Sequence, residues 1–88
     1  MKYYAALLNI KDREKNATYR QNHVDFLIQK EKEGKIFARG RFVDDAGGLV
    51  IYIADSLEKA MEIAGSDPYV TSGARILELH EWDMKLAQ

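Results

Sequence analysis

Short apolar runs alternate with polar, turn-forming segments along the chain, and four of these runs predict β-strands. Residues 2–10 and 49–54 are short and rich in aromatic and aliphatic side chains, as buried strands are. Residues 35–42 and 74–82 give two further strands, the last with Leu and Ile side chains alternating between its faces. Glycines and aspartates in residues 43–48 supply the turn between the second and third strands.

Two segments between these strands have helical spacing instead. Residues 17–33 place Val24, Leu27 and Ile28 on one helical face, and Gly34 is suited to end that helix. Ser56 can cap a second helix, in which apolar residues recur at helical intervals; a single helical turn is expected over residues 67–73. The order strand, helix, strand, strand, helix, strand predicts an α+β, ferredoxin-like fold: one antiparallel sheet with two helices on one face.

The first and third predicted strands are apolar on both faces. In residues 2–10, Tyr3, Ala5 and Leu7 point to one side, and the intervening Tyr4, Ala6 and Leu8 point to the other. Two helices in so small a chain can cover only one face of the sheet. We therefore expect a homodimer in which a second copy covers the open sheet face.

Size and composition narrow the class of protein. Residues 1–88 make a single domain, and the net charge of -1 gives no basic surface for nucleic acid. There is no cysteine for disulfides or thiolate chemistry. No apolar stretch is long enough to span a membrane, and the strand-like start at Met1 does not have the form of a signal peptide. A cytoplasmic location is expected, since small secreted domains usually depend on disulfides.

His23 is the first candidate for chemistry, because histidine is the common general acid and base at neutral pH. It borders the apolar stripe of its predicted helix, one turn after Arg20. An imidazole beside a fixed cation suits an anionic or phenolic ligand. The alternative is a half-buried histidine that only packs at a helix edge, and position alone favours that alternative.

Three aspartates are candidates to orient His23: Asp44, Asp45 and Asp67. Each also has a purely structural explanation. Asp67 precedes Pro68 and can cap a helix, whereas Asp44 and Asp45 suit a turn. Sequence spacing leaves the choice among them open.

The remaining polar and aromatic residues give weaker indications. Glu78 and His80 share one face of the last strand and are as well explained by an interface as by a site. Tyr69 can stack on an aromatic ligand or pack in the core. The two histidines lack a metal-ligand spacing, and no glycine-rich phosphate loop or nucleophile elbow is present. We expect no metal and no cofactor.

The chain resembles the YciI-like proteins of the YCII-related family over nearly its full length. The resemblance is carried by Arg20-x-x-His23, Glu33-Gly34-Lys35-Ile36, Gly40, Asp45-Ala46-Gly47, Ser56-Leu57-Glu58-Lys59-Ala60 and Asp67-Pro68-Tyr69-Val70 followed by Gly73. It implies a ferredoxin-like dimeric α+β barrel in which two sheets pack face to face. It also implies a pocket near a His–Asp pair proposed as an active site, with His23 as the histidine and Asp67, Asp44 or Asp45 as the aspartate.

The resemblance implies a class of chemistry as well. Related proteins isomerise or dehydrohalogenate small cyclic or aromatic compounds without organic cofactors. Members commonly have Gly-Pro after the second strand, whereas this chain has Gly40-Arg41, which adds a positive charge near the expected pocket and favours an anionic ligand.

The sequence thus predicts a cofactor-independent acid/base enzyme for a small anionic or aromatic compound, with elimination or isomerisation as its reaction. The alternative is a dimer that binds a small ligand without catalysis. The candidate catalytic residues are His23, Asp67 and Asp44, and the candidate ligand-binding residues are Arg20, Gly40, Arg41 and Tyr69.

Overall fold

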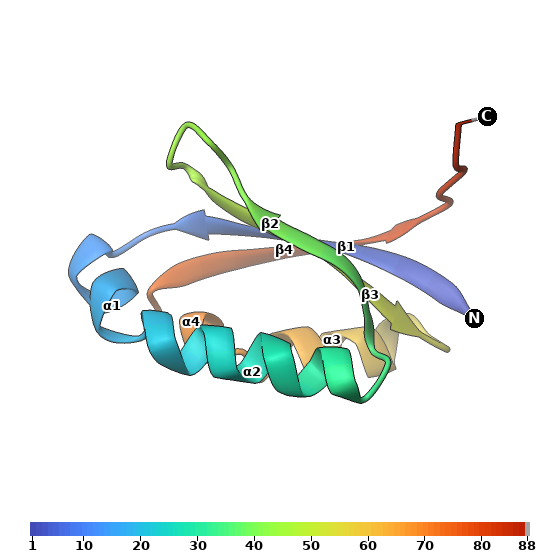
Figure 1. The fold of residues 1–88 in the computed structure, drawn as a ribbon, viewed down its shortest axis with the longest axis horizontal. Coiled ribbons are helices and arrows are strands. Elements are labelled where there is room, and N and C mark those ends of the chain that lie inside the picture. The colour runs from blue at the N-terminus through green and yellow to red at the C-terminus, as the bar shows by residue number, and fades with distance from the viewer. Residues whose placement is uncertain (88) are drawn as a thin grey trace.

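The computed structural model describes residues 1–87, which form a four-stranded sheet and four helices (Figure 1). In chain order the elements are β1 (Lys2–Ile10), α1 (Arg13–Thr18), α2 (Arg20–Lys32), β2 (Ile36–Arg41), β3 (Gly47–Ala54), α3 (Leu57–Gly65), α4 (Pro68–Thr71) and β4 (Arg75–Trp82). The longest helix, α2, has 13 residues, and no helix in this part of the chain is long and apolar enough to cross a membrane.

The strands lie in the order β2-β3-β1-β4, and every neighbouring pair is antiparallel. The two halves of the chain therefore interleave, because β3 from the second half lies between β1 and β2 of the first. This is the ferredoxin-like arrangement, so the predicted α+β fold is confirmed.

The core lies between the sheet and the helices. Alternate residues of β1, namely Tyr4, Ala6 and Leu8, point into it and are almost fully buried. Val50 and Tyr52 of β3 continue the same layer, while Leu27, Ala60 and Ala64 close it from the helix side. The two alanines are small, which lets the backbone of α3 approach the sheet closely.

The opposite face of the sheet carries none of the four helices (Figure 1). Phe37, Ile76 and Trp82 on the strands remain exposed, although each has a large apolar side chain. The central strand β1 shows the same asymmetry, since Tyr3, Ala5 and Leu7 are only half-buried. Within residues 1–87 the helices thus bury one face of the sheet and leave a second apolar face accessible to solvent.

One helix was not expected from the sequence. The predicted elements leave residues 11–16 as a connection between strand 2–10 and helix 17–33, but α1 begins at Arg13, with the Asp12 side chain accepting a hydrogen bond from Lys15 N at 3.1 Å. No residue of α1 is buried, so its sequence contains no apolar stripe from which the helix could be predicted. The chain turns at Tyr19, and α2 starts at Arg20 rather than at residue 17.

Gly47 allows a close approach between β3 and β1. Its φ is +146°, a conformation that L-residues with side chains rarely adopt, and a Cβ there would overlap the Leu8 carbonyl oxygen. At the next position, a Cβ on Gly48 would lie 2.8 Å from the Gly40 carbonyl oxygen. Neither position can accept a side chain without a shift of backbone.

We expect Gly47→Ala to lower the free energy of unfolding by about 2–3 kcal/mol, from backbone strain and the clash with Leu8. Urea denaturation measures this loss. Gly40→Ala is the matched control on the same sheet, because nothing lies within 4 Å of a Cβ there. It should change stability by less than about 1 kcal/mol, and equal losses in both variants would contradict the account.

Candidate functional site

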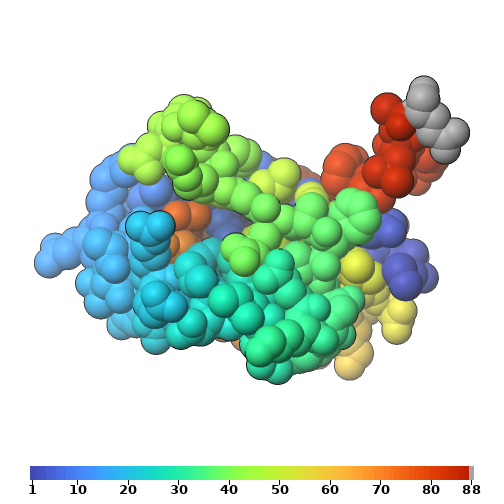
Figure 2. Space-filling view, viewed as in Figure 1, coloured from blue at the N-terminus to red at the C-terminus, as the bar shows by residue number. Residues whose placement is uncertain are grey.

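A cavity of about 480 Å³ opens at one end of the molecule, a size typical of small-molecule sites. Figure 2 shows the hollow between the loop that follows β2 and the segment formed by α1 and α2, with orange atoms near the start of β4 deep inside it. The residues lining it come from β1, α1, α2, β2, β3, α4 and β4, so nearly every element contributes to its walls.

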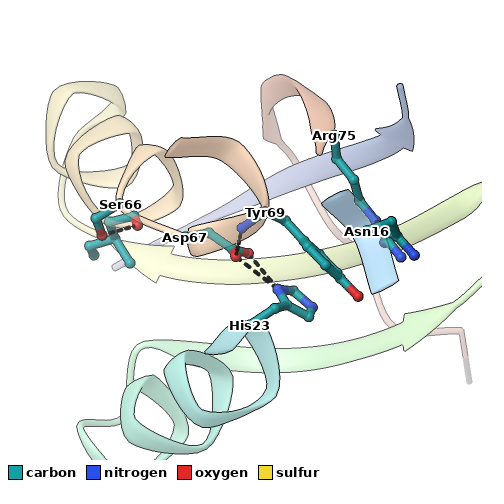
Figure 3. Close-up of polar contacts among 7 residues, drawn as sticks. Asn16, His23, Ser66, Asp67, Tyr69 and Arg75 are labelled. Carbon is teal, nitrogen blue, oxygen red and sulfur yellow. Dashed lines mark hydrogen bonds and ion pairs between the residues drawn. The ribbon is translucent and has the colours of Figure 1, made fainter. Parts of the chain in front are cut away.

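His23 lines this cavity from α2 and is only 9% exposed. Its Nδ1 lies 2.8 Å from both carboxylate oxygens of Asp67 (Figure 3). A carboxylate on Nδ1 favours the tautomer in which Nδ1 carries the proton and donates it to the hydrogen bond. The second ring nitrogen, Nε2, lies on the side away from Asp67 and is then the basic nitrogen.

Asp67 reaches His23 from the other half of the chain and is fully buried. It is the N-cap of α4, where its Oδ1 accepts a hydrogen bond from Tyr69 N at 2.9 Å and Pro68 occupies the first turn. The same carboxylate therefore caps α4 and contacts His23. The structural and functional interpretations of Asp67 do not exclude each other.

The other two aspartates lie elsewhere. Asp44 is exposed, and its Oδ1 accepts a hydrogen bond from Ala46 N at 3.0 Å within the turn. Asp45 lines the cavity but forms an ion pair with Arg13 at 2.9 Å. Of the three candidates, only Asp67 contacts His23.

Tyr69 stacks on the His23 ring, with ring centroids 4.0 Å apart and an interplanar angle of 20°. The guanidinium carbon of Arg75 lies 4.1 Å from the same tyrosine ring centre. Two groups this close to one ring centre must occupy opposite faces, and Figure 3 shows the tyrosine between them. The tyrosine thus connects the imidazole to a cation.

The charge of the cavity wall is strongly positive. Four arginines line it, and they are Arg20, Arg39, Arg41 and Arg75. Arg39 is bound by Glu31 at 3.1 and 3.2 Å, and the lining carboxylate Asp45 is bound by Arg13. The four residues predicted to bind ligand, Arg20, Gly40, Arg41 and Tyr69, all lie in this wall.

Sequence reasoning missed Arg75 and Asn16. Arg75 begins β4, and its Nε donates a hydrogen bond to Asn16 Oδ1 at 2.8 Å. The two residues are 59 positions apart and neither belongs to a recognisable motif. A single arginine at the start of a strand is expected to be a solvent-exposed charge, so the contact between Asn16 and Arg75 cannot be predicted from the sequence.

Tyr52 lies beneath the site and has its hydroxyl buried. Burial, and secondarily the negative charge of Asp67, raises the pKa of Tyr52 well above its ordinary value. The phenol therefore stays neutral beside the His–Asp contact.

Among residues 1–87 no group of three or more histidine, aspartate or glutamate side chains is arranged to hold a metal ion. His80, the second histidine, bonds to Glu78 at 2.8 Å on the open sheet face and takes no part in the cavity.

Comparison with known proteins identifies the family of the chain. The sequence profile of the YCII-related domain matches residues 1–83. The chain belongs to the YCII-related family. A relative in that family, the uncharacterized protein YjpA of Bacillus subtilis (strain 168), is 39% identical over 85 residues, covering 94% of this chain and 98% of its own.

A solved structure similar to this YCII-related chain is 5-chloro-2-hydroxyhydroquinone dehydrochlorinase from Burkholderia phenoliruptrix AC1100, in complex with 2,5-dihydroxybenzoquinone. The TM-score is 0.79 over 94% of this chain and 95% of that one, at 15% sequence identity. At that identity the likeness establishes a shared fold.

We expect Asp67→Asn to change the tautomer of His23. In the parent protein the neutral ring should carry its proton on Nδ1, because the carboxylate accepts only. The asparagine amide replaces one acceptor by an NH₂ donor, so the form protonated on Nε2 should gain population. Ring ¹⁵N chemical shifts measure this change. Asp45→Asn is the control, and an identical tautomer in all three proteins would contradict the prediction.

Proposed function

We propose that this one-domain protein is a cofactor-independent enzyme that performs general acid/base chemistry on a small anionic or aromatic compound, by elimination or isomerisation. The observation that carries the proposal is the buried contact between His23 and Asp67 at the wall of an arginine-lined cavity. A base of this kind, oriented by a carboxylate and facing a cavity, suits abstraction of a proton from carbon.

The proposed reaction begins at Nε2 of His23. This nitrogen takes a proton from a carbon next to a carbonyl, and the electron pair of the C–H bond moves into an enolate. The imidazolium that results is stabilised by the Asp67 carboxylate. Returning the proton to a different carbon completes an isomerisation. Departure of a leaving group from the neighbouring carbon, with release of the proton to solvent, completes an elimination.

The arginines support the enolate in this scheme. Arg20 and Arg41 line the cavity, and neither forms an ion pair with another of residues 1–87. A fixed positive charge near the developing oxyanion lowers the barrier to proton abstraction. The similar solved structure supports the choice of reaction, because a dehydrochlorinase catalyses an elimination on a cyclic compound.

The positive wall also favours a second candidate function. An arginine-lined cavity can bind an anion without transforming it, as an accessory or ligand-binding protein would. The two candidates differ in what His23 contributes.

We expect His23→Ala to lower the rate of proton abstraction at least about 100-fold, because it removes the base. The assay follows deuterium incorporation from D₂O into a panel of small cyclic carboxylates and phenolic ketones. His80→Ala, which removes the other histidine, is the matched control and should keep the parent rate. Exchange that persists in a folded His23→Ala protein would reject the enzyme proposal and favour the binding protein.

We also propose that the protein is a cytoplasmic homodimer, joined through the open sheet face. Light scattering after size exclusion should then give twice the chain mass of 10.1 kDa. Ile76→Glu, at a 55% exposed position on that face, should yield monomers, because it buries a charge in the interface. Leu57→Glu, at a 51% exposed position on α3, should leave the dimer intact. A monomeric parent protein would contradict this assembly.

A further inference from the structure

Arg75 is held at the cavity wall by two side chains, neither of which is a carboxylate. Its Nε donates to Asn16 Oδ1 at 2.8 Å, and its guanidinium lies over the Tyr69 ring. These two contacts come from α1 and α4, while the residue itself begins β4. Three elements therefore fix one guanidinium at the cavity wall, which is the preorganisation that a binding group requires.

The charge of Arg75 lacks a carboxylate partner among residues 1–87. Its cavity neighbour Arg39 is bound by Glu31, whereas no ion pair in this part of the chain includes Arg75. Partial burial lowers the pKa of the Arg75 guanidinium, yet an arginine remains charged at neutral pH. Burying a cation is costly. The more distant charges of Asp67 and Asp45 offset part of that cost, and an anion in direct contact with the guanidinium would offset more of it.

The hydrogen-bonding edge that Arg75 leaves open suits a particular anion. Nε is taken by Asn16, whereas Nη1 and Nη2 make no hydrogen bond of standard geometry within residues 1–87, and their one further polar neighbour is the Tyr69 side chain, which partly offsets the lowering of the guanidinium pKa by burial. These two nitrogens form a parallel pair of donors that matches the two oxygens of a carboxylate. The space beside them depends on Gly48, where a Cβ would lie 3.4 Å from Nη1.

The position of Arg75 relative to His23 limits the length of the ligand. The imidazole and the guanidinium carbon lie 4.0 and 4.1 Å from the Tyr69 ring centre, so they are separated by about 8 Å at most. A molecule bound to both would carry its carboxylate a few bonds from the carbon that faces Nε2 (Figure 3).

We propose that Arg75 is a substrate-binding residue and that the substrate is a small carboxylate, held end-on by Nη1 and Nη2 while a C–H a few bonds away faces His23. This inference rests on the proposed function for the identity of the base, but binding of the carboxylate requires no catalysis. Asn16 and Tyr69 are positioning residues for the guanidinium.

Binding of benzoate, compared with its neutral isostere benzamide, tests the proposal on the full-length protein by titration followed in ¹H–¹⁵N spectra, including the arginine Nε signals. Benzoate should bind at least about tenfold more tightly than benzamide. Arg75→Gln should weaken benzoate binding about tenfold or more and leave benzamide within about twofold, because only the anion uses the guanidinium. Arg75→Lys should give an intermediate affinity, since it keeps the charge but loses the paired donors.

Two further variants separate this inference from its alternatives. Arg39→Gln removes the same charge from the same wall, but from a guanidinium already bound by Glu31, and should weaken benzoate less than about threefold. His23→Ala should also stay within about threefold, so loss of turnover and loss of binding are independent results.

The proposal is overturned if the folded parent protein shows no benzoate binding at about 20 mM, or binds benzamide equally well. It is also overturned if Arg39→Gln weakens benzoate as much as Arg75→Gln does, since the diffuse charge of the wall would then account for binding. Retained benzoate binding with no exchange chemistry in any substrate would instead sustain the carboxylate site and reject the enzyme.

Discussion

The buried carboxylate of Asp67 is the constraint on which the site depends. A carboxylate with no exposed surface is destabilising unless its oxygens accept hydrogen bonds, and here Tyr69 N and His23 Nδ1 supply them. The start of α4, the position of α2 and the orientation of the imidazole are therefore coupled, because each satisfies part of the same buried group. The carboxylate that caps α4 also orients the imidazole of His23.

The arrangement of elements could be predicted from the sequence because it follows from local patterns. The short apolar run of β1 and the helical spacing in α2 each leave a local signal, and the element order then permits few topologies. The site could be predicted only in part. His23 stands out by residue type, but a capping aspartate looks the same whether or not a histidine lies against it. Helix α1 lacks an apolar stripe, and the contact between Asn16 and Arg75 joins residues 59 positions apart.

In the proposed chemistry, the His23–Asp67 contact and the residues of the cavity wall have different roles. Under the mechanism proposed above, His23 and Asp67 move a proton in the same way for an isomerisation and for an elimination, since both begin with an enolate. What separates the two outcomes is whether the neighbouring carbon of the ligand bears a leaving group. The His–Asp contact therefore defines the chemistry without defining the substrate, and selectivity has to come from the cavity wall.

The shape of the cavity wall depends on its glycines, just as its charge depends on its arginines. Gly47 and Gly48 bring β3 close to β1 and β2, and a side chain at Gly48 would approach the guanidinium of Arg75. Tyr69 lies between this guanidinium and the imidazole and contacts both. A ligand anchored at Arg75 would thus present to Nε2 a carbon chosen by its distance from the anchor. In such a site the place of the anion, rather than the strength of the base, decides which C–H bond is broken.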